Sequence, residues 1–319
     1  MTTFVPAERR TLYFIGVSTA KSSIMKVFPR WAEHLNISDA AIKGMDFVVH
    51  DDPEAYRRAV AFIRSDPLSL GALVTTHKID LFEACHDLFD EIGSHARLMG
   101  ETSCLSKRDG RLICHAKDPI ASRLSLEAFV PQGHFARTGA DVFCMGAGGS
   151  AIAITWNLMR KENGDNVPAR IIVSNRSPDR LDRLRTIHTE IDSAVPVSYV
   201  LAEKAGDNDA VLADLKPGSL VINATGLGKD APGSPLGDAA QFPERALAWD
   251  LNYRGDLVFL DQARRQQQTR GIHVEDGWVY FLHGWTQVIA EVFDIAIPAT
   301  GPGFDALSEI AAATRRPAS

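Results

Sequence analysis

Short apolar runs alternate with longer stretches of helical spacing along the chain. In the first stretch, residues 11–17 (TLYFIGV) lead through a polar loop into residues 24–35, where apolar side chains recur every three or four positions. The cycle then repeats. The strands and helices expected in this half are, in order, residues 11–17, 24–35, 45–49, 53–65, 71–74 and 79–89. This alternation is typical of βαβ units and a largely parallel sheet.

A hairpin is expected around the turn Asp109-Gly110, between residues 102–105 and 111–114. A second series of βαβ units begins near Gly139. Its expected strands are residues 141–145, 170–174, 196–201, 219–223, 246–251 and 272–275, and its expected helices are residues 150–160, a segment from 178 onward, and 278–293. The pattern therefore predicts an α/β protein with a doubly wound parallel sheet and a second α/β unit before it.

Length and composition narrow the class. At roughly 100 to 200 residues per domain, 319 residues predict two domains. With 40 acidic against 34 basic side chains, the chain lacks the excess of positive charge that is typical of nucleic-acid-binding proteins. A small-molecule substrate is therefore the expected partner. No signal peptide or membrane span is expected, and the four cysteines form no CxxC pair. We expect a cytoplasmic protein without a metal site, as a monomer or a homodimer.

A glycine-rich turn follows the strand expected at 141–145. It reads G-x-G-x-x-A and consists of Gly146, Ala147, Gly148, Gly149, Ser150 and Ala151. In dinucleotide-binding folds the first glycine makes the tight turn, the second admits the pyrophosphate, and the helix N-terminus faces the phosphates. The motif predicts a dinucleotide cofactor, and a glycine turn without a ligand is the alternative.

The end of the next expected strand indicates which dinucleotide is bound. An NAD-binding chain places an acidic side chain there to accept hydrogen bonds from the ribose 2′-OH. This chain has Asn175, Arg176 and Ser177 instead, with Arg180 one turn further on. The planar fork of an arginine matches a 2′-phosphate, and no carboxylate at the strand end repels it. NADP is therefore expected in preference to NAD.

Another glycine-containing segment follows the strand expected at 219–223, at the sheet edge that faces ligands in α/β folds. It consists of Asn223, Ala224, Thr225 and Gly226. Together with the glycine-rich turn, residues 175–177 and residues 250–253 (DLNY), it resembles the nucleotide-binding half of the shikimate dehydrogenase family. The resemblance extends over almost the whole chain. It implies that these segments bind the cofactor and that Tyr253 is a substrate ligand.

The resemblance also implies a catalytic pair. Residues 74–78 (VTTHK) resemble the family's N-V-T-x-P-x-K segment, with one position missing and no proline, so Thr75 matches a substrate ligand and Lys78 the catalytic lysine. Asp118 stands where the family has the aspartate of N-T-D. Hydride transfer at a carbinol carbon requires a proton to leave or join the oxygen, which a titratable dyad provides. Which member is the base stays open, because Asp118 favours a charged Lys78 whereas burial favours the neutral amine.

Several substrate-binding positions depart from the family. In its G-x-P-x-x-H-S-x-S-P loop, Ser22 is the best match to a serine ligand, and Lys21 is either an added cation for the substrate or a solvated side chain. Ser103 replaces the asparagine of G-A-x-N-T, and Gly284 replaces a glutamine of the C-terminal helix. A buried donor without its substrate hydroxyl costs about 1 to 3 kcal/mol, so these changes predict a substrate other than shikimate.

The resemblance implies a substrate domain of residues 1–122 plus 276–319 and a Rossmann-type NADP-binding domain of residues 123–275. It implies an NADP-dependent oxidoreductase of the CH-OH class, similar to the enzymes of aromatic amino acid biosynthesis, that acts on a cyclic or polyhydroxylated acid. Two alternatives remain: a genuine shikimate or quinate dehydrogenase, and a non-catalytic NADP-binding regulator. A separate question concerns three residues of the expected helix 278–293. They either line the changed substrate pocket or only pack and solvate this helix: His283, Trp285 and Gln287.

Overall fold

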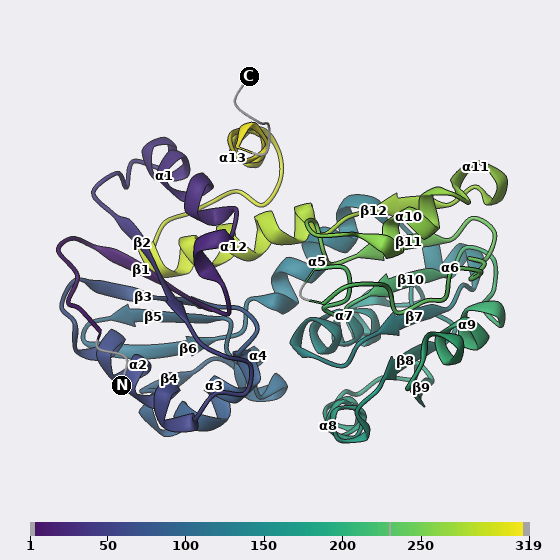
Figure 1. Cartoon of the computed structure of the whole chain (residues 1–319), viewed down its shortest axis with the longest axis horizontal. Helices are drawn as coiled ribbons and strands as arrows, with labels where there is room; N and C mark the ends of the chain where they lie inside the picture. Colours follow the sequence, from purple (N-terminus) through teal and green to yellow (C-terminus); the bar gives the residue numbers. More distant parts are fainter. Residues whose placement is uncertain (1–3, 230, 315–319) are drawn as a thin grey trace. The chain divides into compact units, whose positions relative to one another are not determined.

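The computed structural model describes residues 4–229 and 231–314 of the chain (Figure 1). The chain divides into two compact units. One comprises the residues up to Asp118 together with those from Leu282 onward, and the other comprises Pro119–Phe281. The boundary expected at residue 122 falls inside helix α5 (Asp118–Phe129), and the one expected at residue 276 falls just before helix α12 (Trp278–Phe293).

The first unit is built on a mixed six-stranded sheet of order β2-β1-β3-β5-β6-β4, in which β5 runs antiparallel to β3 and β6. Its elements are β1 (Thr11–Gly16), α1 (Ile24–His34), β2 (Ala41–Asp46), α2 (Pro53–Ser65), β3 (Ser69–Val74), α3 (Lys78–Cys85), β4 (Glu91–Ile92), α4 (Ser94–Met99), β5 (Cys104–Arg108), β6 (Arg111–His115) and α13 (Pro302–Ala313), with single 3-10 turns η1 (Thr19–Lys21) and η2 (His86–Leu88). Buried residues such as Ile15, Tyr56 and Leu105 form the core of this unit.

Some boundaries in this unit differ from the expected ones. The strand expected at residues 45–49 is β2, which ends at Asp46, because Val48 and Val49 are exposed in the loop that follows instead of being paired in the sheet. The helix expected at 79–89 ends at Cys85 and continues as a 3-10 turn. The hairpin is confirmed: Asp109 and Gly110 both have positive φ, the conformation that favours a two-residue turn between twisted strands.

The second unit is built on a wholly parallel sheet of order β12-β11-β10-β7-β8-β9 (Figure 1). Its elements are α5, α6 (His134–Thr138), β7 (Val142–Met145), α7 (Gly149–Met159), β8 (Ile171–Asn175), α8 (Pro178–Thr189), β9 (Val197–Leu201), α9 (Ala205–Ala213), β10 (Leu220–Asn223), β11 (Leu247–Asp250), α10 (Val258–Arg264), α11 (Gln267–Arg270) and β12 (His273–Glu275), with a 3-10 turn η3 (Lys161–Asn163). This is the doubly wound dinucleotide-binding order, whose direction reverses between β7 and β10. A ligand is expected outside the carboxyl ends of those two strands.

Buried His188 makes the stability of the second unit sensitive to acid. Its ring shares hydrogen bonds of 2.8 Å with the Thr155 hydroxyl and 2.8 Å with the Tyr199 hydroxyl. Burial lowers the pKa of His188 from 6.5 to about 4. Between pH 6.5 and about pH 4, His188 is therefore protonated in the unfolded chain but neutral in the folded chain. The free energy of unfolding falls as the pH drops through this window, by on the order of 3 kcal/mol.

We expect His188→Gln to flatten the dependence of the unfolding free energy on pH across this acidic window. Urea titrations at a series of pH values measure it, with the exposed His34→Gln as the matched control. An unchanged slope in His188→Gln would remove this histidine as a source of acid sensitivity.

Within the described ranges 4–229 and 231–314, no helix is long and apolar enough to cross a membrane. The same ranges hold no group of three or more His, Cys, Asp or Glu side chains arranged to bind a metal ion.

Candidate active site

Lys78 and Asp118 are in direct contact in the first unit. Lys78 is the first residue of α3, just after β3, and Asp118 opens α5, just after β6. The Lys78 ammonium donates a hydrogen bond to Asp118 Oδ2, with side chains only 16% and 8% exposed. The Lys78 carbonyl also accepts a hydrogen bond from the Thr102 N–H, 3.0 Å long. The sheet thus brings together two residues that lie 40 positions apart in the sequence.

The surroundings of Lys78 keep it charged. Burial acts to lower the pKa of Lys78, but the charges of Asp118 and Glu101 and the hydrogen bond to Asp118 outweigh it, so the pKa is raised. A paired ammonium is therefore the resting form of this lysine. It can give a proton to an oxygen atom that gains negative charge.

Glu101 is a buried residue of this site that the sequence analysis missed. It lies directly after Gly100, the left-handed residue that ends α4, and it has no exposed surface. Its charge acts on Lys78, which gives the lysine a second acidic neighbour beside Asp118. The family pattern G-A-x-N-T has alanine at this position, and a carboxylate in place of that alanine was the signal available in the sequence.

The loop after β1 lies at the same sheet edge as the end of β3. A Cβ atom on Gly16 would lie 3.0 Å from the Thr75 hydroxyl. Within this loop, Ser22 is buried and its N–H donates to the Thr19 carbonyl (2.9 Å), while Lys21 is exposed. Asp46 fixes the loop by accepting hydrogen bonds from the Thr19 N–H (2.8 Å) and hydroxyl (2.5 Å).

Thr75 and Ser103 already have partners within the protein. The N–H and the hydroxyl of Thr75 both donate to the Ile15 carbonyl, at 3.0 and 3.2 Å. The hydroxyl of Ser103 accepts a hydrogen bond of 2.6 Å from the Lys117 N–H, next to Asp118. The observed role of Ser103 is thus to hold the segment that carries Asp118, and a contact from its own O–H to a substrate hydroxyl stays a prediction.

Helix α12 packs two of its residues within the first unit, and a role of His283, Trp285 or Gln287 in lining the substrate pocket stays a prediction. His283 stacks on Phe304 with ring centroids 4.4 Å apart, and Trp285 meets the edge of Phe14 at 5.0 Å, so both residues pack the first unit. Burial lowers the pKa of His283 to about 4. Among the described residues, no atom other than the nearby backbone of α12 itself lies within 4 Å of where a Cβ of Gly284 would be. The lost glutamine therefore leaves open space beside this helix.

The glycine-rich turn joins β7 to α7 in the second unit, at the point where the strand order reverses. Gly146 has φ +120°, and a Cβ there would lie 2.6 Å from the Ala224 carbonyl oxygen, so this turn packs directly on the segment after β10. Gly148 precedes α7 and has open space at its Cβ position. Ala147 and Ala151 are buried, and the Ser150 hydroxyl accepts a hydrogen bond of 3.0 Å from Tyr280.

The turn after β8 presents two exposed arginines. Asn175 Oδ1 accepts a hydrogen bond from the Ser177 N–H (2.9 Å), and Ser177 caps α8 by accepting from the Arg180 N–H (3.4 Å). Arg176 and Arg180 are exposed on either side of this cap, Asp179 is exposed beside Arg180, and residues 174–177 contain no carboxylate. The turn can bind an anionic group.

The segments after β10 and β11 are joined by a buried amide and carboxyl. Asn223 donates to Asp250 (3.1 Å) and accepts from the Thr225 N–H (3.1 Å) and hydroxyl (2.6 Å). Burial raises the pKa of Asp250 to about 7. Asn252, within the segment 250–253 that carries the family resemblance, donates to the Leu227 carbonyl (2.9 Å). Ala224 and Thr225 are half-buried and Gly226 is exposed at this edge.

Tyr253 follows this network in the second unit. Its ring centroid lies 5.3 Å from that of Trp278 and 4.7 Å from that of Phe281, and its side chain is half-buried. These contacts fix the tyrosine ring in an aromatic cluster of its own unit, whereas Ser22 and Thr75 belong to the first unit.

The fold and these two sets of residues define a class of two-unit α/β proteins. One unit has a parallel sheet of the dinucleotide-binding order with a glycine turn at its reversal point, and the other has a buried lysine–aspartate pair. No model of a known protein family matches the chain. However, the shikimate dehydrogenase (NADP(+)) of Symbiobacterium thermophilum is 31% identical over 234 residues, which cover 72% of each protein. The chain therefore belongs to the shikimate dehydrogenase family.

Other relatives agree with this assignment over shorter segments or in fold alone. Three further curated shikimate dehydrogenases are matched over 58% to 61% of their own lengths. The solved structure of shikimate 5-dehydrogenase from Thermus thermophilus, in complex with NADP(H) and shikimate, has a TM-score of 0.67 at 20% identity and covers 95% of this chain and 99% of that one. Quinate dehydrogenase from Corynebacterium glutamicum, in complex with NAD, gives 0.69 at 17% identity and covers 96% and 99%.

Proposed function

We propose that this protein is an NADP-dependent oxidoreductase of the shikimate dehydrogenase kind, which acts on the C–OH or C=O group of a cyclic or polyhydroxylated acid. The observation that carries the proposal is the buried contact between Lys78 and Asp118. A protein that only senses a dinucleotide has no use for a proton-transfer pair, and its two charges are costly to bury without a function.

The residues of the second unit fit a dinucleotide. The open space at Gly148 lets a pyrophosphate approach the backbone. Gly148 is the N-cap of α7 and has no side chain to accept hydrogen bonds, so the N–H groups of the first turn can bind the phosphates. The segment after β10 lies beside the same turn, because Gly146 packs on Ala224. The residues proposed to contact the cofactor from this segment are Asn223, Ala224, Thr225 and Gly226. When bound, NADP supplies the hydride acceptor or, in its reduced form, the hydride donor.

Lys78 performs the proton transfer in this proposal. As an ammonium it donates to the substrate oxygen while a carbonyl is reduced, and as an amine it accepts the hydroxyl proton in the reverse direction. Asp118 holds the Nζ atom through the observed hydrogen bond and stabilises its charged form.

The substrate proposed here is an acid whose hydroxyl pattern differs from that of shikimate. Ser103 stands at the position of the family's asparagine, and its hydroxyl accepts a hydrogen bond from the Lys117 N–H. Gly284 stands at the position of the family's glutamine and leaves open space there. Ser22, Thr75 and Tyr253 remain the proposed ligands of the substrate itself. Loss of two amides that read hydroxyl groups supports a changed specificity, because unpaired buried polar groups discriminate strongly.

Arg176 is proposed to bind the 2′-phosphate of NADP. Charge-assisted hydrogen bonds contribute about 1.5 to 3 kcal/mol, so we expect Arg176→Ala to reduce the preference for NADP over NAD by about tenfold to a hundredfold. Titration calorimetry with both dinucleotides measures the preference. Arg185→Ala, at an exposed position of helix α8 beyond the turn that carries Arg176, is the matched control. Equal preferences in Arg176→Ala and the unaltered protein would place the 2′-phosphate elsewhere.

A substrate panel tests the proposed activity. Purified protein is mixed with NADP or NAD and with hydroxy acids that include shikimate and quinate, and formation of the reduced cofactor is followed by its absorbance. We expect fastest turnover with NADP on a panel member other than shikimate and quinate. Fastest turnover of shikimate or quinate would establish the genuine dehydrogenase instead, and binding without turnover on any member would support a regulator.

The proposal needs no partner beyond the cofactor and the small acid, in a monomer or a homodimer. Cys85, Cys104, Cys114 and Cys144 are buried free thiols, which fits the cytoplasmic location expected from the sequence.

A further inference from the structure

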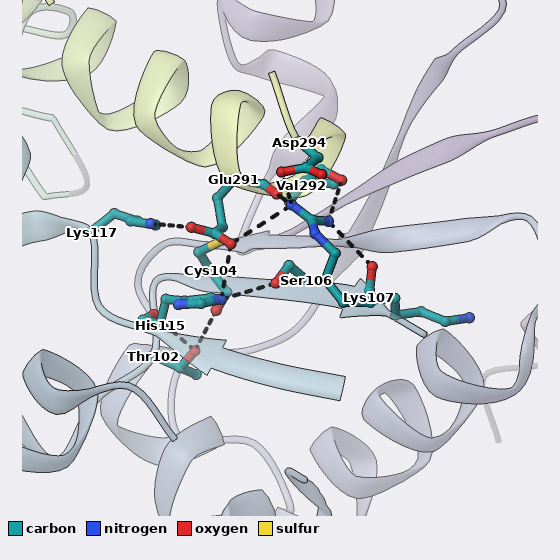
Figure 2. Close-up of polar contacts among 10 residues, drawn as sticks. Thr102, Cys104, Ser106, Lys107, His115, Lys117, Glu291, Val292 and Asp294 are labelled. Atoms are coloured by element: carbon teal, nitrogen blue, oxygen red, sulfur yellow. Dashed lines mark hydrogen bonds and ion pairs between the residues drawn. The ribbon is translucent and has the colours of Figure 1, made fainter. Parts of the chain in front are cut away.

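A cluster of charged side chains ties the end of helix α12 to the strands that precede Asp118 (Figure 2). Lys117 Nζ lies 2.6 Å from Glu291 Oε2, and His115 Nε2 lies 3.4 Å from Glu291 Oε1. Arg108 contributes from β5: its guanidinium donates to the main-chain carbonyls of Glu291 and Val292. The cluster thus fixes both the side chain and the backbone at Glu291.

The Lys117–Glu291 pair is shielded from solvent. The two side chains are only 14% and 25% exposed. Burial acts to raise the pKa of Glu291, but the hydrogen bond from Lys117 and the charges of His115, Lys117 and Arg108 lower it, so this carboxylate is charged. A shielded pair holds its two side chains in one geometry more strictly than an exposed pair does.

The pair acts on the residue next to the proton-transfer dyad. Lys117 directly precedes Asp118, and its N–H donates to the Ser103 hydroxyl at 2.6 Å. The segment is therefore held at three successive points: the Lys117 backbone by Ser103, the Lys117 side chain by Glu291, and the Asp118 side chain by Lys78. Only the last of these contacts belongs to the dyad.

We propose that Glu291 is a positioning residue that, through Lys117, holds the Asp118 carboxylate against Lys78. The family pattern N-T-D has threonine where this chain has Lys117, so the ion pair is a feature of this chain's own sequence. It directs the Lys117 charge toward α12 and away from a role as a ligand for an anionic substrate. The inference rests on the proposed function insofar as Lys78 and Asp118 are the proton-transfer pair.

The first experiment compares three variants of the full-length protein. Glu291→Gln removes the charge that holds Lys117. The double variant Lys117→Met with Glu291→Met replaces the pair by apolar side chains of similar size, which restores stability when a pair serves only the fold. Asp294→Asn is the matched control, because Asp294 contacts the same Arg108 at 3.3 Å but is 82% exposed.

We expect Glu291→Gln to lower kcat by about tenfold with the KM for NADP unchanged, because a positioning group acts on the chemical step and not on cofactor binding. Glu291→Asp is expected to recover part of that loss. The double variant should regain the thermal midpoint of the unaltered protein while kcat stays low, and Asp294→Asn should match the unaltered protein in both. Recovery of kcat together with stability in the double variant would overturn the inference and leave the pair a purely structural role.

A second readout does not depend on turnover. The pKa of Lys78 is followed by NMR titration, with its signal assigned by its loss in Lys78→Met. Because Asp118 raises the pKa of Lys78, displacement of Asp118 should lower that pKa in Glu291→Gln and in the double variant. An unchanged pKa in both variants would overturn the inference. If the unaltered protein turns over no substrate, the proposed function fails, while this titration still decides whether Glu291 positions Asp118.

Discussion

Replacement of Lys78 by alanine is expected to lower kcat by about two to four orders of magnitude, the contribution of a positioned general acid or base. The dissociation constant for NADP is expected to change little, because the glycine turn that is proposed to bind it belongs to the other unit. Steady-state kinetics on the best substrate of the panel and calorimetry with NADP measure the two quantities separately.

The variant leaves buried acidic neighbours without their cation, so its folding must be measured alongside its activity. Asp118→Asn provides a second test at the dyad, since it keeps a hydrogen-bonding group beside Lys78 while removing the charge that raises the lysine's pKa. Lys26→Met, at an exposed lysine, serves as the control. Unchanged kcat in folded Lys78→Ala would remove the dyad from the mechanism.

Substitution of the two key glycines of the β7–α7 turn is expected to separate folding from cofactor binding. Gly146→Ala forces a side chain into a positive-φ position with its Cβ 2.6 Å from the Ala224 carbonyl oxygen, so it should cost about 1 to 3 kcal/mol of unfolding free energy for the backbone conformation, and more for the clash. Gly148→Ala meets open space and has no positive φ, so stability should stay within about 0.5 kcal/mol.

The same open space is where the pyrophosphate is proposed to approach. The methyl group of Gly148→Ala should therefore weaken NADP binding by at least about tenfold, or 1.4 kcal/mol, in a protein of normal stability. Denaturant titration and calorimetry on both variants give the four values needed. Normal NADP affinity in Gly148→Ala would show that the dinucleotide does not use this turn.

Elements with strong local signals could be predicted from the sequence. Helix α2 begins and ends where expected, because Asp52 caps it by accepting a hydrogen bond from the Glu54 N–H (3.0 Å) and Pro53 occupies its first turn. Helix α12 likewise has the expected bounds. The bounds expected for strand β2 are wrong because most of its residues are partly exposed, so the apolar residues of the sequence do not mark where this strand begins and ends. The two-residue strand β4 leaves no periodic pattern to detect.

The candidate site divides in a similar way. The glycine turn and the arginines after β8 are contiguous motifs, which is why residues 146–151 and 175–180 could be singled out from the sequence. Lys78 and Asp118 were joined only by resemblance to a family, because neither spacing nor composition links them. The contact between Lys117 and Glu291 spans 174 positions, so it depends on the return of the C-terminal segment to the first unit, and no local pattern reports it.

Transfer of deuterium from the cofactor to the substrate tests directly whether the protein is a dehydrogenase that uses Lys78 for proton transfer. NADPH that carries deuterium in place of both hydrogens at the nicotinamide C4 is incubated with the protein and the keto form of the best panel substrate, and the product is analysed by mass spectrometry. We expect one deuterium on the new carbinol carbon in the unaltered protein, and a rate of transfer lower by about two to four orders of magnitude in Lys78→Ala. Binding of NADPH without transfer to any member of the panel would contradict it.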